Sequence, residues 1–153
     1  MKTWKTIIAL LLILGAITAI SPFGKTIQPV NATTVSTPPP AVWNKTYGGT
    51  STDYAVSLVQ TSDGGYVLAG YTSSFAAGND DAWLVKTDAQ GSMQWNKTYG
   101  GTGADYASSM VETKDGGYAL AGSTDSFGAG KKDAWLVKID SAGSMQWNKT
   151  YGG

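Results

Sequence analysis

The side chains that could do chemistry in this 153-residue chain are few in type. It contains ten aspartates, a single glutamate (Glu112) and eleven lysines, with no arginine, histidine or cysteine. Without histidine and cysteine there can be no Ser-His-Asp triad, cysteine nucleophile, disulfide or Cys/His zinc site. Carboxylates are left as the main acids, bases and metal ligands, and we predict that the chain is not an enzyme.

Carboxylates support two kinds of chemistry. A pair of them can hydrolyse glycosides, but Glu112 is the single glutamate and the sequence marks no such pair. Asp80, Asp81 and Asp88 supply the oxygen ligands that Ca²⁺ prefers. However, Lys132 stands in place of Asp80 in the second copy of the repeat described below, and a turn-forming role accounts for Asp88. We therefore predict no metal site and no cofactor.

Four Asn-x-Thr sequences are acceptors for N-linked glycans in exported proteins. They begin at Asn31, Asn44, Asn96 and Asn148. The last three belong to one repeated motif, so they represent one event copied along the chain. In a strand, Asn96 and Thr98 share the face opposite to Trp95. We expect an accessible asparagine on an outer edge strand, open to modification where the host has the machinery.

Trp83 and Trp135 occupy the same position in two copies of the repeat. Their rings could stack on sugars, which would make them ligand-binding residues. Packing in the core is the simpler role, because aromatic side chains supply most of the burial that small sheets can achieve. Both interpretations stay open from the sequence, and packing is preferred.

A seven-residue motif, Trp-Asn-Lys-Thr-Tyr-Gly-Gly, organises the chain. It stands at 43–49 and recurs unchanged at 95–101 and 147–153, always 52 residues apart. The segments 43–94 and 95–146 are identical at 37 of 52 positions, so both must adopt one local structure. We predict two complete repeats, 43–94 and 95–146, and a partial third repeat at 147–153.

Turn signals divide each repeat into four short apolar runs, which are 53–61, 66–72, 82–87 and 92–99 in the first copy. Asp63-Gly64-Gly65 supplies the positive φ of a tight hairpin, so successive runs should be antiparallel strands. Glycine density and the lack of a 3.6-residue period exclude a helical solenoid, whereas a β-solenoid is a less favoured alternative. The predicted fold is all-β: two four-stranded antiparallel blades of β-propeller type, preceded by an N-terminal apolar signal helix. One spare strand is also predicted, because three motif copies accompany only two sets of the other strands.

Three stretches of the first repeat carry a family resemblance. They are 61–70 (Thr-x-Asp-Gly-Gly-Tyr-Val-Leu-Ala-Gly), 81–91 (Asp-Ala-Trp-Leu-Val-Lys-x-Asp-x-x-Gly) and 95–101 (Trp-x-Lys-Thr-Tyr-Gly-Gly). The pattern resembles the repeats of archaeal and bacterial surface β-propeller proteins and is more distantly similar to the delta-60 repeats of secreted bacterial propellers. The resemblance runs from Trp43 to the last residue. It implies a propeller-type fold and little about activity.

A chain with two blades departs from that family pattern, because full propellers have about 4–8 blades. Three explanations stay open. The sequence is a piece of a longer multi-blade protein, or several chains associate, or the two blades form an open pair.

The N-terminal third is typical of an exported protein. Lys2 and Lys5 precede the 14-residue apolar run Ile7–Ile20, which is shorter than the roughly 20 residues that span a membrane. We predict a signal peptide or signal anchor at 1–32, with Val30-Asn31-Ala32 as a workable cleavage site, and a Thr/Pro-rich extended linker at 33–42. The expected location is outside the cell or on its surface.

Charge and composition narrow the partners. From Thr33 onward there are eight lysines against eleven acidic residues, a net charge of −3 that disfavours nucleic acid. We expect a structural or adhesive surface scaffold whose partners are other blades, in the same chain or in a neighbouring one, and surface glycans or proteins. A lectin-like propeller that binds carbohydrate or another ligand is the alternative. Membrane contact is expected only through the N-terminal segment.

Overall fold

The computed structural model describes residues 42–153. The predicted signal segment 1–32, the sequon at Asn31 and all but the last residue of the predicted linker 33–42 lie outside the described residues. The described part consists of strands, turns and loops. It includes no helix long and apolar enough to cross a membrane.

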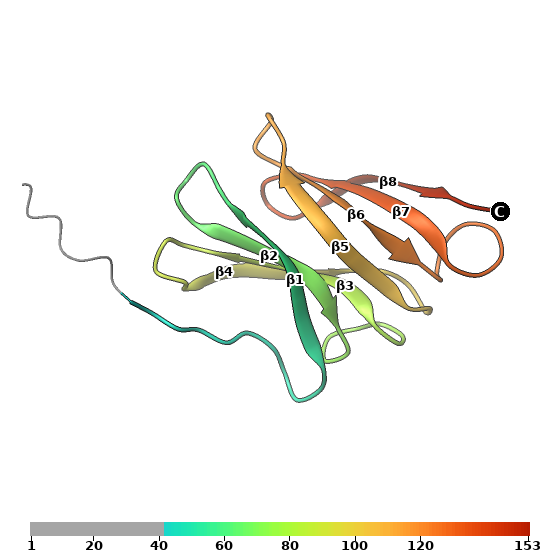
Figure 1. The fold of residues 1–153 in the computed structure, drawn as a ribbon, viewed down its shortest axis with the longest axis horizontal. Coiled ribbons are helices and arrows are strands. Elements are labelled where there is room, and N and C mark those ends of the chain that lie inside the picture. The colour runs from blue at the N-terminus through green and yellow to red at the C-terminus, as the bar shows by residue number, and fades with distance from the viewer. Residues whose placement is uncertain (1–41) are drawn as a thin grey trace, which may run out of the picture. The chain divides into compact units, whose positions relative to one another are not determined.

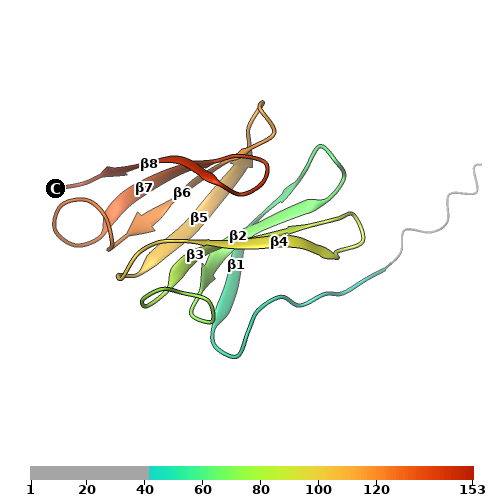
Figure 2. The ribbon, with the colours of Figure 1, turned by 180° about the vertical axis from the view of Figure 1, so that it is seen from behind.

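Eight strands form two four-stranded sheets (Figures 1 and 2). Sheet 1 contains β1 (Asp53–Gln60), β2 (Tyr66–Thr72), β3 (Asp81–Thr87) and β4 (Met93–Tyr99). Sheet 2 contains β5 (Asp105–Glu112), β6 (Tyr118–Thr124), β7 (Asp133–Ile139) and β8 (Met145–Tyr151). Within each sheet the strands follow chain order, and every neighbouring pair is antiparallel. The prediction of two four-stranded antiparallel sheets is confirmed.

The sheets are offset from the sequence repeats. Each predicted repeat starts with the seven-residue motif, whereas each sheet ends with it, in β4 and in β8. The motif copy at 147–153 therefore completes sheet 2. The copy without a sheet is the first one, Trp43–Gly49, which forms no strand among the described residues. The second and third copies pair with the preceding strands β3 and β7, whereas no strand precedes the first copy within residues 42–153.

The turn between β1 and β2 shows how local sequence sets the hairpins. Gly64 has φ +84°, and the Gly65 N–H donates to Asp63 Oδ1 over 3.0 Å. Lys86, only 4% exposed on β3, reaches this turn with its Nζ 2.8 Å from Asp63 Oδ2. Sheet 2 repeats the pair with Lys138 and Asp115 at 2.9 Å. Charge and turn chemistry thus tie the third strand to the first hairpin in both sheets.

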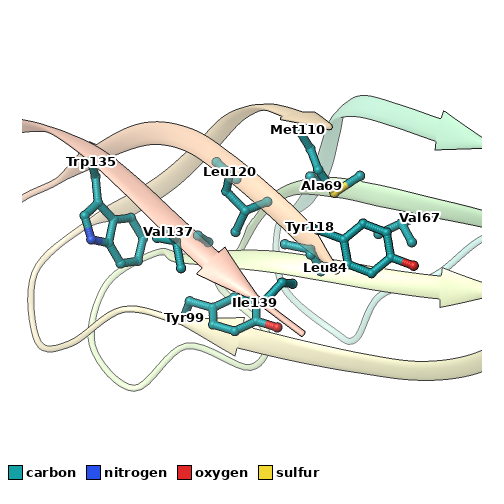
Figure 3. Close-up of a cluster of buried hydrophobic side chains, with 12 residues drawn as sticks. Val67, Ala69, Leu84, Tyr99, Met110, Tyr118, Leu120, Trp135, Val137 and Ile139 are labelled. Carbon is teal, nitrogen blue, oxygen red and sulfur yellow. The ribbon is translucent and has the colours of Figure 1, made fainter. Parts of the chain in front are cut away.

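One apolar core lies between the sheets (Figure 3). We call the side of sheet 1 that enters this core its forward face, and the side of sheet 2 that enters it its rear face. Repeat-equivalent sides carry the same name. The forward face of sheet 2 is therefore the side whose residues lie 52 positions after those of the forward face of sheet 1, and the rear face of sheet 1 is the opposite side of that sheet. The forward face of sheet 1 contributes Val67, Ala69, Ala82, Leu84 and Tyr99, and the rear face of sheet 2 contributes Met110, Tyr118, Leu120, Trp135, Val137 and Ile139. In the same core, β5 packs against β1, β2 and β3.

The two copies of one leucine test how much this stacking contributes to stability. Leu84 is fully buried between the sheets, whereas its equivalent Leu136 is partly exposed on the forward face of sheet 2. Leu84→Ala should lower the free energy of unfolding by about 3 kcal/mol because it leaves a cavity. Leu136→Ala should cost about 1 kcal/mol or less. Urea unfolding of both variants in dilute solution checks this, and equal losses would contradict the assignment of the core.

Candidate functional site

Three tyrosines form a row across β1 and β2 of sheet 1 and β5 of sheet 2. Tyr54 on β1 and Tyr71 on β2 have ring centroids 5.1 Å apart, and Tyr71 and Tyr106 on β5 have centroids 4.9 Å apart at an interplanar angle of 80°. Tyr54 is 53% exposed, and the other two are half-buried. This tyrosine row presents aromatic surface to solvent where the two sheets meet.

Groups of both charges surround Tyr106. Its hydroxyl donates to Asp80 Oδ2 over 2.9 Å, and Lys132 Nζ lies 4.6 Å from the centre of its ring. The hydrogen bond to Asp80, together with burial and the nearby negative charges, raises the pKa of Tyr106 above its usual value. The phenol therefore stays protonated at neutral pH and keeps its role as a donor.

Two open depressions adjoin Tyr106. One, of about 620 Å³, is lined by Ser73, Gly78, Asn79, Asp80, Ala104 and Tyr106. The other, of about 310 Å³, is lined by Val56, Tyr71, Tyr106, Ala107, Ser108 and Ser123. Aromatic faces beside a carboxylate, an amide and hydroxyls are suited to a polar ligand with one apolar side, such as a sugar. The arrangement can bind such a ligand, and the lining includes no activated nucleophile.

Sequence reasoning missed the tyrosine row. Tyr54 and Tyr106 are equivalent repeat positions, and Tyr71 is the register partner of Tyr54 across the first hairpin. The hairpin turn could have revealed the Tyr54–Tyr71 pair. The approach of Tyr106 could not have been found in this way, because it depends on how sheet 2 packs on sheet 1.

The two predicted stacking tryptophans lie in the interior. Trp83 is 4% exposed and Trp135 is 3% exposed. Trp83 packs against Phe75 with ring centroids 5.9 Å apart, and Trp135 packs against Phe127 at 5.8 Å. These environments favour the packing role and leave too little ring surface for a stacked sugar.

The described sequons are accessible. Asn44, Asn96 and Asn148 are all exposed. The Asn96 side-chain oxygen accepts a bond from Trp83 Nε1 over 3.3 Å, and the Asn148 oxygen has the same partner in Trp135. Asn96 and Asn148 lie on β4 and β8, the strands at the far edge of each sheet from the β1 and β5 tyrosines. A glycan there would leave the tyrosine row free.

The acidic residues considered for Ca²⁺ are divided between two places. Asp88 lies in the β3–β4 turn, where its Oδ1 accepts the Gln90 and Ser92 N–H groups at 2.9 and 2.8 Å. Asp80 belongs to the Tyr106 site, and its neighbour Asp81 begins β3. In the part of the chain that the structure covers, no three acidic side chains are grouped so that they could hold a metal ion.

Asp81 is the most unusual carboxylate of the described residues. It is 2% exposed, and its Oδ2 accepts the Ala77 N–H over 2.8 Å, while its Oδ1 is buried without a hydrogen-bond partner. Burial raises the pKa of Asp81, and the charges of Asp105 and Asp80 raise it further. An unsatisfied buried oxygen of this kind destabilises the charged form.

The pH dependence of stability should report this carboxylate. The pKa of Asp81 in the folded state lies above its unfolded value of about 3.9, so its contribution to stability is present below that pH and is lost as the pH rises through the folded pKa. Asp81→Asn removes this charge. The variant should therefore gain stability relative to the wild type as the pH rises from about 3 to about 7. Urea midpoints that differ by the same amount at both pH values would contradict this account.

A comparison with models of known protein families gave no match to this chain, and a comparison with curated proteins gave no significant match.

Proposed function

We propose that the chain is a secreted or cell-surface repeat protein that acts as a structural or adhesive scaffold, and that each of its sheets is a β-propeller-type blade. The N-terminal sequence pattern supports export. The observation that carries the scaffold role is the use of the repeated polar side chains to hold the fold together.

The aspartates that begin β1 and β5 show this use. Asp105 is fully buried, and its carboxylate accepts the Gly101 N–H at 2.9 Å and the hydroxyls of Thr124 and Ser126. In sheet 1, Asp53 makes the same set of bonds to Gly49, Thr72 and Ser74. Burial alone would raise the pKa of Asp53, but these hydrogen bonds outweigh it, so the pKa is lowered and the carboxylate stays charged.

Two further pairs of repeated carboxylates have structural partners in both sheets. Asp63 and Asp115 each pair with a lysine, and Asp88 and Asp140 each accept two backbone N–H groups in the β3–β4 and β7–β8 turns. Polar groups that are bonded in both copies stabilise the blade and are not free for acid–base chemistry. Such a chain offers surfaces for recognition and a repeat that can be stacked.

Export can be tested with the full chain carrying a C-terminal epitope. In intact bacterial cells the epitope should be accessible to added protease, because the segment 1–32 directs the chain outward. Leu12→Lys interrupts the apolar run and should keep the epitope protected, whereas Leu136→Lys, outside that segment, should not. An epitope protected in intact cells with the unaltered chain would contradict the proposed location.

The tyrosine row supports a second candidate function, the binding of carbohydrate. The half-buried ring of Tyr106 lines both depressions, and the Asp80 carboxylate and the Tyr71 ring each line one of them. In this function the scaffold would present a sugar site near the first strands of both sheets, and the edge strands would carry the sequons.

A glycan array probed with the full chain tests this function. Tyr71→Ser removes a ring that lines one depression and introduces the residue found at the equivalent position, Ser123, so the variant should fold while its affinity for any bound sugar falls at least roughly tenfold. Val111→Ala alters a side chain that is 56% exposed and lies outside the linings of both depressions, so it serves as the control. If no glycan binds, or if the Tyr71→Ser variant binds as the wild type does, the lectin-like function is wrong.

A further inference from the structure

The two outer faces of the two-sheet stack are covered differently. The rear face of sheet 1 is partly covered by Trp43–Gly49, which we call the cap segment. Trp43 packs on Tyr66 of that face, with ring centroids 6.0 Å apart at an angle of 62°. On the forward face of sheet 2, Leu136 is partly exposed, and Ala121 and Ala134 are exposed. Within residues 42–153, one end of the stack therefore carries a seven-residue cover that the other end lacks.

The cap segment contacts sheet 1 in the way that the motif on β4 contacts sheet 2. The Trp95 ring lies 6.4 Å from that of Tyr118 at 63°, which matches the Trp43 pair. Tyr47 Oη donates to the Gly91 carbonyl over 2.6 Å, and Tyr99 Oη donates to the Gly143 carbonyl over 2.8 Å.

The backbone of the two segments is held in the same way. The Gly49 N–H donates to Asp53 Oδ2 over 2.9 Å, and the Gly101 N–H donates to Asp105 Oδ2 over the same distance. The cap segment thus makes with sheet 1 the contacts that the outer strand β4 makes with sheet 2, although the cap segment itself belongs to no sheet among the described residues.

The third motif copy belongs to a sheet, but its aromatic side chains are exposed. On β8, Trp147 is 43% exposed and Tyr151 is 58% exposed. The equivalent residues on β4 are more enclosed: Trp95 is half-buried and packs on the core, and Tyr99 is 5% exposed. The difference arises because sheet 2 covers the β4 motif, and nothing in the described part of the chain covers the β8 motif.

We propose that a second copy of this chain covers it by motif exchange. The motif at 147–153 of one copy displaces the cap segment of the next copy, and the forward face of the first copy's sheet 2 then packs on the rear face of the neighbour's sheet 1. The contact reproduces the interface that already joins sheet 1 to sheet 2 within one chain, with Trp147 on Tyr66 and Tyr151 on the Gly91 carbonyl of the neighbour.

The direction of the exchange follows from backbone pairing. The motif on β8 is held along its length by β7, with pairs from Ala134–Tyr151 to Ile139–Met145. The cap segment has no strand partner among the described residues, so its release breaks side-chain contacts and isolated hydrogen bonds but no ladder. Trp147 and Tyr151 remake the contacts that the cap loses. The exchange also buries apolar surface that is now open, including Leu136 and the neighbour's Leu58, which is 62% exposed.

Charge is compatible with this occupant. In the internal interface Asp80 bonds to Tyr106, and in the exchanged interface the equivalent pair is Lys132 and the neighbour's Tyr54. A lysine over a tyrosine ring is an attractive cation–π contact, and Lys132 already makes one with Tyr106 at 4.6 Å. The two faces are different surfaces, so the association is head-to-tail, and the cap segment opposes it.

Matched variants of the full chain distinguish this mechanism. In sedimentation velocity, with the protein in a mild density-matched detergent, the wild type should associate as its concentration rises. Trp43→Ala with Tyr47→Ala weakens the cap, so association should occur at concentrations at least roughly tenfold lower. The same two changes at Trp147 and Tyr151 remove the donor motif, and that variant should stay monomeric at every concentration.

A variant with all four changes separates exchange from sticking of an uncovered face. It should be monomeric, because it lacks the donor motif even though its cap is weak. The proposal would be overturned if this variant associated, or if the variant changed only at Trp147 and Tyr151 associated as strongly as the wild type does. Circular dichroism verifies that each variant keeps its sheets. The exchange gives the proposed scaffold a second copy of the chain as its partner, and it rests on the proposed function only in placing this association outside the cell or on its surface. Association of the purified chain is measured whether or not export or sugar binding is found.

Discussion

The packing of sheet 1 on sheet 2 is the interaction on which the rest of the described structure depends. A four-stranded sheet with apolar residues on both faces cannot bury them alone, and each large aliphatic side chain removed from water contributes about 1.5–3 kcal/mol. The side chains of Leu84, Leu120, Val137 and Ile139 are completely or almost completely buried because the two sheets meet there. The same contact brings Tyr106 to Tyr71 and Asp80, so the candidate ligand site is a consequence of the stack.

Polar residues complete the stack at its loop ends. Asp105 accepts bonds from the glycine that follows β4 and from hydroxyls that follow or end β6, and so it joins the incoming chain to its own sheet. In this arrangement the charged form of Asp81 is destabilised, because its buried Oδ1 has no hydrogen-bond partner and the charges of Asp105 and Asp80 lie nearby. The same arrangement recurs in sheet 1, where Asp53 accepts bonds from Gly49 at the end of the cap segment and from the hydroxyls of Thr72 and Ser74.

A stack made of near-identical layers has ends that fit its own interior. The rear face of sheet 1 and the forward face of sheet 2 are copies of the two faces that already pack together. Natural proteins cover such ends because they invite further association. Here the first motif copy covers one end as a segment with no ladder partner among the described residues, and the last copy leaves aromatic side chains exposed at the other. This asymmetry is the basis for the proposed exchange between copies.

The sequence by itself determined what is local. The 52-residue period, the Asp-Gly-Gly turns and the apolar runs predicted all eight strands to within about two residues and their antiparallel order, because turn chemistry and strand alternation act over a few residues. Only the tertiary structure decided which motif copy lacks a sheet, how deeply Trp83 and Asp81 are buried, and which tyrosines meet. Tyr99 and Tyr151 show the physical reason: they stand in identical motifs, yet they are 5% and 58% exposed, because burial depends on whether a neighbouring sheet is present.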